Sequence, residues 1–244
     1  MPNDDTQLLP PTVPNVPYKT VRPELATGDL FFLQTASPQA KWIKRIEDHY
    51  RLTEYSHLGM VVKDGDKLYL WDAPGRGQCF HDHYAAEDPD NRLFGSDPVH
   101  PGCRVSELDA VLEYYATLVD VEPKGFWLRR LTQPVSSDQF AAFRRFINRA
   151  DGLPFPEELG YAALAANFAA GQAGMTLFFG TYFCSQLVAD SYMHMGVLEL
   201  DGRPPNAYAP AHFGLETTAE FRMTDPPPWV KPPGLDTTRF VTWP

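Results

Sequence analysis

The feature that most constrains the fold of this chain is the stretch "SHLGMVVKDGDKLYLWDAP", residues 56–74. Two runs rich in β-branched, aromatic and other apolar residues flank Asp64-Gly65, a dipeptide that is a strong signal for a two-residue hairpin turn. If these two residues form the turn, Lys63 pairs with Asp66. The stretch therefore predicts two antiparallel strands in which the numbers of paired residues add to 129.

This register places His57 directly opposite Asp72, with Cβ atoms about 4.5–5.5 Å apart on one face. A carboxylate at that distance can fix the tautomer and orientation of an imidazole, as in a nucleophile–base–orienter triad. Gly59 on the same face would leave room for a helix to approach closely. Two alternatives stay open: a His–Asp pair is often a structural hydrogen bond in a sheet, and a shift of one residue would separate the two side chains.

A second feature is "TYFCSQLVADSYMHMG", residues 181–196, which predicts a helix that starts at Cys184 and stops at Gly196. Helical spacing puts Cys184 in the first turn, on a stripe that faces the protein body. The unsatisfied amides of a helix start stabilise a thiolate, and they can also bind an oxyanion in acyl transfer. Cysteine is common in protein cores as well. The His57–Asp72 pair nevertheless favours a nucleophilic Cys184. A purely structural interpretation would need both the pair and the helix-start cysteine to occur by coincidence.

The remaining patterns predict both helices and strands, as in the α+β fold that we expect. "TGDLFFLQ" and "GFWLRRL" are typical of strands, whereas helices are expected in "SPQAKWIKRIEDHY" with Ser37 as N-cap, in "SELDAVLEYYATLVD", and in "SSDQFAAFRRFINRADG" with a Ser136–Gln139 capping box. The Ala-rich "YAALAANFAAGQAG" fits either a packed helix or a lid over a site. Six of the 24 prolines fall in the first 23 residues, which predicts an extended arm, and a second Pro-rich segment near the C-terminus carries Trp229 and Trp243.

Composition excludes several classes of function. The net charge of -10 and the pI near 5.1 argue against binding to nucleic acid or docking on anionic lipid through charge. No segment approaches 18 uninterrupted apolar residues, so we expect no integral membrane segment, and the N-terminus does not resemble a secretory signal. Three cysteines are too few and too odd in number for a disulfide framework, which favours a reduced, cytoplasmic protein.

One segment invites a metal hypothesis. "HDHY" brings together His81, Asp82 and His83, with Cys79 and Cys103 on either side. Structural zinc sites usually use paired ligands such as CxxC, and these spacings do not match. A solvated loop is therefore the expectation, with no metal, and no dinucleotide or phosphate-binding glycine pattern indicates a cofactor.

In this order, "TGDLFF", "YSHLGMVV", "LYLWDAP" and "YFCSQLVADSY" resemble the NlpC/P60 papain-like superfamily. The order, histidine first and cysteine last, is that of its circularly permuted branch, the YiiX/YaeF-like (DUF830) proteins. The resemblance spans roughly residues 24–215, and the stretches 78–125 and 154–178 look like insertions. It implies a papain-like catalytic domain over 24–215, between a Pro-rich arm (1–23) and a C-terminal extension (216–244) that packs on the domain.

The resemblance also implies a small antiparallel sheet packed against the cysteine-bearing helix. Cys184 is similar to the family's nucleophile and His57 to its base, whereas Asp72 stands where the family usually has a glutamate. The expected activity is that of a cysteine hydrolase or acyltransferase, which cleaves an amide or ester bond in a small-molecule, peptide or lipid-like substrate. The alternative is a binding module or scaffold that keeps the pocket without catalysis, and oligomeric state stays open.

Overall fold

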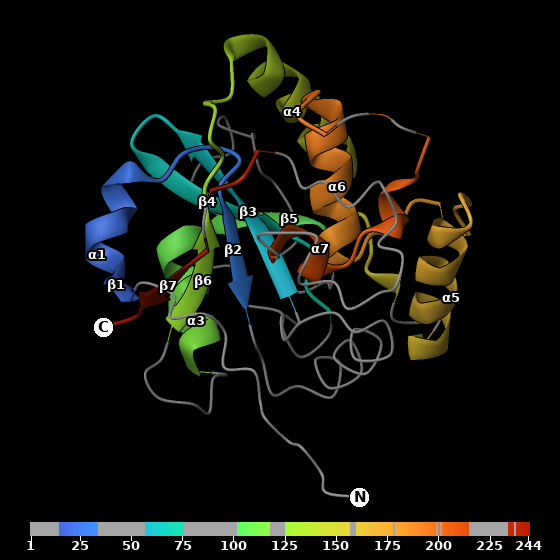
Figure 1. Cartoon of the computed structure of the whole chain (residues 1–244), viewed down its shortest axis with the longest axis horizontal. Coiled ribbons are helices and arrows are strands. Elements are labelled where there is room, and N and C mark those ends of the chain that lie inside the picture. Colours follow the sequence, from blue (N-terminus) through green and yellow to red (C-terminus); the bar gives the residue numbers. More distant parts are fainter. Residues whose placement is uncertain are drawn as a thin grey trace, which may run out of the picture.

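The computed structural model describes residues 15–33, 57–75, 102–117, 125–156, 160–177, 179–198, 200, 202–214, 234–236 and 238–244 (Figure 1). Its elements follow one another along the chain as β1 (Asn15–Pro17), α1 (Tyr18–Val21), η1 (Arg22–Glu24), β2 (Leu30–Leu33), β3 (His57–Asp64), β4 (Lys67–Asp72), β5 (Arg104–Glu107), α3 (Leu108–Thr117), β6 (Gly125–Arg129), α4 (Ser137–Ala150), α5 (Gly160–Gln172), α6 (Cys184–His194), η3 (Pro205–Ala207), α7 (Pro210–Gly214) and β7 (Arg239–Thr242).

The strands form a seven-stranded sheet in the order β1-β7-β6-β2-β3-β4-β5. Neighbouring strands are antiparallel except β1 and β7, which run parallel, so the sheet is mixed and the fold is α+β. The sequence correctly predicted β2, the β3–β4 hairpin and β6. These four strands occupy the middle of the sheet.

The register of the hairpin differs from the prediction by two residues. Asp64 pairs with Lys67 and Met60 with Trp71, so the turn is formed by Gly65 and Asp66, and the paired numbers add to 131. Gly65 has a φ of +59°, a left-handed conformation that glycine adopts without a Cβ penalty. The same register sets Asp72 level with Gly59, and His57 becomes its diagonal neighbour. A shift of two residues preserves the face, so both side chains still lie on the same side of the sheet.

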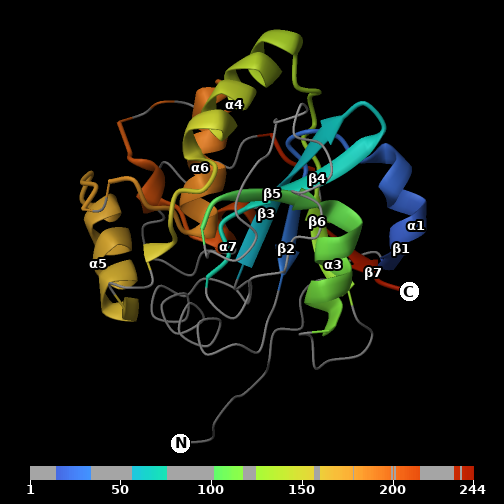
Figure 2. The same ribbon diagram turned by 180° about the vertical axis from the view of Figure 1, so that it is seen from behind.

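The sheet separates two apolar cores. On one face, Leu58, Met60 and Trp71 pack with residues of α4 and α6; on the other, Val61 and Leu70 pack with α1 and α3. Figure 1 shows α4 beside α6, and Figure 2 shows α3 from the opposite side. The alternation of side chains along β3 places Gly59 on the α3 face.

The expectation that Gly59 makes room for the cysteine helix is therefore wrong. A Cβ at Gly59 would lie 2.7 Å from Cγ of Leu70, which covers this position, while α6 packs on the other face of the sheet. The physical reason is the diagonal packing of a long side chain over a glycine on the neighbouring strand.

The predicted helices agree with the structure wherever it describes them. α4 begins with the predicted capping box, in which the backbone N–H of Gln139 donates to the Ser136 hydroxyl and the backbone N–H of Ser136 donates to the Gln139 side chain. α3 buries the expected apolar stripe. The helix expected at residues 37–50 lies outside the described residues.

The Pro-rich ends contribute strands that the sequence did not predict. Val16 in β1 pairs with Val241 in β7, and β7 continues the sheet next to β6. Trp243 lies against the rings of Tyr18 and Phe126, with centroids 4.9 and 5.9 Å apart. Both ends of the described chain therefore belong to the sheet. Trp229 lies outside the described residues.

Candidate active site

His57 links the residues that the sequence singled out. Its Nε2 donates to Oδ2 of Asp72 at 3.0 Å, and Cys184 is the second side chain that interacts with its ring and raises its pKa. Because Nε2 is directed at Asp72, Nδ1 is the ring nitrogen left for a proton from Cys184. All three side chains are buried, with relative exposures of 1% for His57, 0% for Asp72 and 2% for Cys184. The structure thus aligns thiol, imidazole and carboxylate in that order.

Cys184 is the first residue of α6, as the sequence predicts. The preceding residue, Phe183, is extended and provides no side-chain cap, and the first backbone bond of the helix runs from the N–H of Leu187 to the carbonyl of Phe183. The N–H groups of the first turn have no carbonyl partner within the helix, and they carry its positive dipole end. A thiolate on Cys184, or an oxyanion beside it, would meet this charge.

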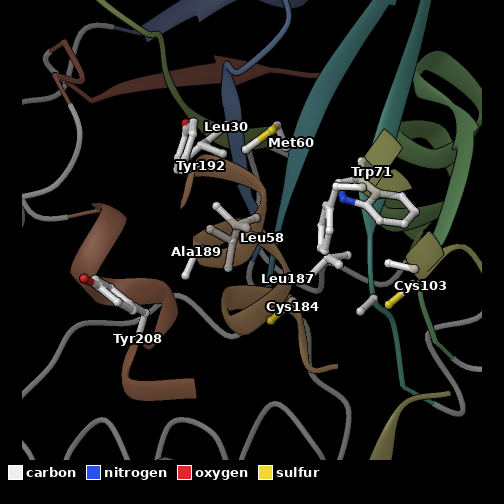
Figure 3. Packing of buried hydrophobic residues seen from close by; sticks show 14 of the residues in the cluster. Leu30, Leu58, Met60, Trp71, Cys103, Cys184, Leu187, Ala189, Tyr192 and Tyr208 are labelled. Carbon is white, nitrogen blue, oxygen red and sulfur yellow. The ribbon is translucent and has the colours of Figure 1, made fainter. Parts of the chain in front are cut away.

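Apolar packing and a polar contact hold α6 against the sheet. Leu187 and Val188 lie in the core with Leu58 and Met60 (Figure 3). The indole N–H of Trp71 donates to the Ser191 hydroxyl at 3.1 Å, which connects β4 to the middle of the helix. The helix is buried on more than the predicted stripe, since Ser185, Gln186 and Ala189 are buried as well.

The surroundings of His57 favour its protonated form. Burial alone lowers the pKa of an imidazole, but the negative charge of Cys184 and the hydrogen bond to Asp72 outweigh that effect and raise the pKa of His57 to about 9. With a raised pKa, His57 carries a proton at neutral pH when Cys184 is a thiolate. A protonated imidazole beside a cysteine is the arrangement that favours the reactive form of a cysteine nucleophile.

Two residues that the sequence did not assign to the site surround Asp72. The hydroxyl of Tyr115 in α3 donates to Oδ2 at 3.1 Å, and Nε of Arg104 in β5 lies 3.7 Å from Oδ1. Tyr115 falls in a predicted helix whose pattern indicated only a core position, and Arg104 falls within residues 78–125, which the sequence indicated only as an insertion. No pattern pointed to either one, because both reach Asp72 through pairing and packing.

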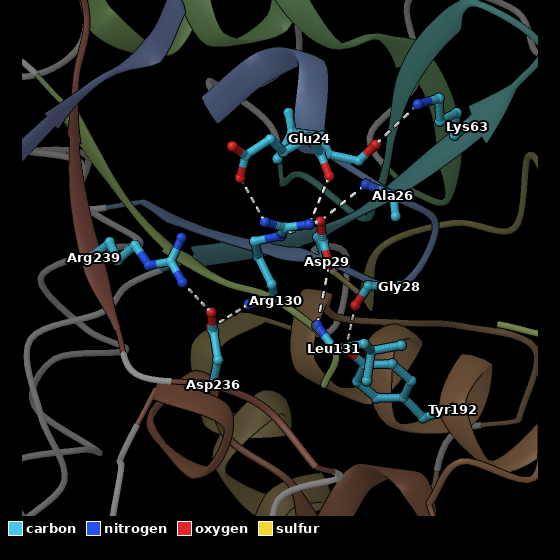
Figure 4. A network of polar contacts seen from close by, with 11 residues as sticks. Glu24, Ala26, Gly28, Asp29, Lys63, Arg130, Leu131, Tyr192, Asp236 and Arg239 are labelled. Atoms are coloured by element: carbon cyan, nitrogen blue, oxygen red, sulfur yellow. Dashed lines mark hydrogen bonds and ion pairs between the residues drawn. The ribbon is translucent and has the colours of Figure 1, made fainter. Parts of the chain in front are cut away.

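Asp29, a second buried carboxylate, lies at the opposite end of β2 from the site. Leu33 is paired with His57, whereas Asp29 precedes Leu30, so four residues, or about 13 Å of strand, separate the two positions. Its side chain accepts from the backbone N–H groups of Ala26 and Leu131 and lies 3.5 Å from Nε of Arg130 (Figure 4). Asp29 is a structural residue in this arrangement.

The Ala-rich helix α5 is fastened to η3 by buried polar groups. The amide of Asn206 donates to the backbone and side-chain oxygens of Asn167 at 2.6 and 3.0 Å, and both residues are fully buried. A Cβ at Gly171 would lie 2.6 Å from the backbone N of Ala207, so the two segments are in close contact. The hydroxyl of Ser185 donates to the carbonyl of Tyr208, which joins this unit to the cysteine helix.

Most of the residues in the metal hypothesis lie outside the ranges that the structure describes. Cys79, His81, Asp82 and His83 lie outside them, and the described residues contain no group of three metal-binding side chains. Cys103 is described, and it is buried as a free thiol.

No helix within the described ranges has both the length and the apolar character that a membrane span requires.

Comparisons with known proteins assign neither a family nor a function to this chain. No protein-family model matches the sequence, and no curated protein matches it. Among solved structures, the chain is similar to YiiX from Escherichia coli O157:H7, described as a metalloprotein of DUF1105, with 20% identity over 90% of this chain and 98% of that one. The TM-score of 0.46 is too low to establish a common fold.

Proposed function

We propose that this protein is a cysteine-nucleophile hydrolase or acyltransferase that acts on an amide or ester bond. The observation that carries the proposal is the position of His57, which bonds to Asp72 through Nε2 and also interacts with Cys184. A nucleophile, a base and a group that orients the base are the three parts that acyl transfer through a covalent intermediate requires.

The reaction would proceed in two steps. The Cys184 thiol transfers its proton to Nδ1 of His57, and the thiolate attacks the carbonyl carbon of the substrate. Free amides at the start of α6 stabilise the resulting oxyanion. The oxyanion collapses, the bond to the leaving amine or alcohol breaks, and His57 returns its proton to that group. Water or another acceptor, deprotonated by His57, then attacks the thioester and regenerates the thiol.

The sequence motifs support a papain-like assignment for this chemistry. The histidine comes from the first strand of a hairpin, the cysteine comes later from a helix start, and the helix packs on the sheet that carries the histidine. This arrangement is what the resemblance to the permuted NlpC/P60 proteins leads one to expect. The substrate class proposed is a small molecule, peptide or lipid-like compound, and nucleic acid is disfavoured by the net charge of -10. Free thiols at Cys103 and Cys184 favour a reduced, cytoplasmic setting.

The second candidate is a binding module that retains the pocket without turnover. The complete burial of His57 and Cys184 favours this alternative, because an enzyme must let a substrate reach the sulfur. The two candidates differ in the chemistry of Cys184. A nucleophile forms a covalent adduct with a carbonyl electrophile, and a merely structural cysteine does not.

The test is a screen of activity probes that carry amide, ester and thioester warheads, applied to the purified protein. We expect at least one class to acylate the wild type at Cys184, as located by mass spectrometry, and not to acylate Cys184→Ala. His57→Ala should slow the acylation strongly. A wild type that reacts with none of the probes, or that reacts equally well without His57, would favour the binding module.

A further inference from the structure

Behind His57 lies a buried polar cluster that the reaction itself does not use. Asp72 accepts hydrogen bonds from both His57 and Tyr115 at the same oxygen, Oδ2. Its other oxygen, Oδ1, is buried and accepts no hydrogen bond among the described residues, and the nearest cation is Arg104 at 3.7 Å. Arg104, Tyr115 and Asp72 are exposed by 4% or less. Burying several polar groups together is energetically unfavourable, so a cluster of this kind points to a structural or functional role.

A fully buried carboxylate is unfavourable unless charges or hydrogen bonds compensate it. His57 alone would provide one bond to Asp72, and only while Nε2 carries a proton. The carboxylate of an aspartate is also free to rotate about its terminal torsion when a single partner holds it. An orienting aspartate that is buried therefore needs further groups to keep it ionised and to fix its direction.

We propose that Tyr115 and Arg104 are positioning residues for the proposed reaction: they hold the Asp72 carboxylate in place and direct it at Nε2 of His57. The inference rests on the proposed function, and it names the parts of the chain that make an aspartate serve as the orienter. Neither residue touches the reacting atoms, so both act through Asp72.

The geometry of Tyr115 suits this role in two ways. Its hydroxyl binds Oδ2, and burial together with the charge of Asp72 raises the pKa of Tyr115 well above its usual range, so the phenol keeps the proton that it donates. Its ring lies against the imidazole, with centroids 5.5 Å apart and planes inclined by 41°. Tyr115 therefore restricts the rotation of both members of the His57–Asp72 pair.

Arg104 supplies the balancing charge. β5 pairs with β4 so that Arg104 stands directly opposite Asp72, and α3, which carries Tyr115, begins immediately after β5. One continuous segment, residues 104–117, thus supplies both positioning groups. With the thiolate formed, Arg104, Asp72, His57 and Cys184 alternate in charge from cation to anion, and the buried site is neutral as a whole.

The experiment measures the rate of Cys184 alkylation by iodoacetamide as a function of pH, which needs no knowledge of the substrate. The variants are Tyr115→Phe, Arg104→Gln and Arg104→Lys, with Asp72→Asn as the reference for a lost orienter. Tyr192→Phe is the matched control. Tyr192 is equally buried and its hydroxyl donates to the carbonyl of Gly28 at 2.5 Å, away from the site, so this change also removes one buried hydrogen bond.

We expect Tyr115→Phe to lower the rate at pH 6 by about tenfold, because a hydrogen bond to a charged group contributes roughly that factor. The acidic limb of its profile should move to higher pH, in the direction of Asp72→Asn. Arg104→Gln should act in the same direction and Arg104→Lys should recover much of the loss. Tyr192→Phe should keep the wild-type profile even if its melting temperature falls.

The outcomes separate this inference from the proposed function. If the wild type itself shows no enhanced labelling of Cys184 at pH 6, the proposed function fails and the positioning role fails with it. If the wild type and Asp72→Asn behave as expected but Tyr115→Phe and Arg104→Gln keep the wild-type profile, only the positioning role is overturned. A profile shift in Tyr192→Phe equal to that of Tyr115→Phe would also overturn it.

Discussion

Two buried cysteines of this protein have nearly the same exposure and opposite electrostatic surroundings. Cys184 is 2% exposed and Cys103 is 1% exposed, and both belong to the same apolar core. Cys184 begins a helix and hydrogen-bonds to an imidazole. Cys103 precedes β5, and burial together with the negative charges of Asp151 and Asp72 raises the pKa of its thiol well above the usual range.

The comparison teaches that burial by itself does not decide the role of a cysteine. Of the two, only Cys184 lies at a helix start and beside an imidazole, two features that favour a thiolate. Asp72 contributes to both environments: it bonds to the imidazole near Cys184, and its charge opposes ionisation of Cys103. Under the proposed function, the same carboxylate supports the nucleophile and helps to keep the other thiol inert.

The largest expected effect is on turnover. With any substrate that the probe screen identifies, Cys184→Ala should lose activity by roughly a thousandfold or more, because no covalent intermediate can form. Cys103→Ala should keep activity within about twofold, since its thiol does not take part. Steady-state kinetics on both variants, with circular dichroism to verify folding, checks this prediction. Equal losses in the two variants would remove the distinction between the cysteines.

The next effect concerns the orienter. Asp72→Asn should slow the labelling of Cys184 at pH 6 by at least about tenfold, because an amide holds the imidazolium less well than a carboxylate does. Asp29→Asn is the control: it changes another buried carboxylate, at the far end of β2, and should leave the labelling rate unchanged. Full reactivity in Asp72→Asn would deprive Asp72 of its role.

A smaller effect is expected in the pH dependence of stability. Burial raises the pKa of Asp29 to about 6, although the amides of Ala26 and Leu131 and the charge of Arg130 oppose the shift. A raised pKa means that the folded state binds this proton more tightly, so the associated stability is present below about pH 4 and is lost as pH rises through 6. The loss is about 3 kcal/mol, since one pKa unit corresponds to about 1.4 kcal/mol.

Urea unfolding at a series of pH values, on the wild type and Asp29→Asn, measures this loss. The difference in unfolding free energy between the two proteins should change by about this amount from pH 4 to pH 7. The difference between wild type and Asp72→Asn should not show the same change over that pH range. A difference that is independent of pH would show that Asp29 does not titrate as expected.

The smallest effect is that of metal removal, for which we expect none. The proposed chemistry uses side chains alone, so chelators should leave activity and melting temperature unchanged. Elemental analysis provides the control. Stoichiometric zinc that is lost, together with stability, in His81→Ala would contradict the prediction and would place a metal at the "HDHY" segment.

Much of the fold and of the site could be predicted because local patterns determine it. The hairpin dipeptide, the capping box at Ser136 and the helix start at Cys184 all depend on residues close in sequence. The register was wrong because the turn dipeptide could be Asp64-Gly65 or Gly65-Asp66, and only packing decides between them. His57 and Asp72 still share a face of the sheet, since the two registers differ by an even number of residues, but this is the face that α3 covers and not the one on which α6 packs.

The parts that could not be predicted depend on contacts between distant segments. β1 is an edge strand, and β7 lies between it and β6; both are short, and they pair with each other from opposite ends of the chain. In the sequence, Tyr115 is an ordinary core residue of an amphipathic helix. Only the tertiary structure shows that its hydroxyl bonds to Asp72. The position of Arg104 opposite Asp72 likewise follows only from the pairing of β5 with β4.

The most direct test of the account is the pH dependence of iodoacetamide labelling at each cysteine, read by mass spectrometry on wild type and His57→Ala. An ordinary thiol, with a pKa of about 8.5, gains reactivity about tenfold per pH unit below that value. The pKa of His57 is raised to about 9, so its imidazole keeps a proton below that pH and can favour the thiolate of a neighbouring cysteine. If Cys184 is a nucleophile, its labelling should therefore fall less steeply toward pH 6 than that of an ordinary thiol.

At pH 6 we predict that Cys184 reacts at least about tenfold faster than Cys103 and Cys79 in the wild type, and that His57→Ala removes most of this preference. Since Cys103 is equally buried, it corrects for access of the reagent. If Cys184 reacts no faster than the other two thiols and His57→Ala changes nothing, Cys184 is a structural cysteine and the catalytic account is wrong.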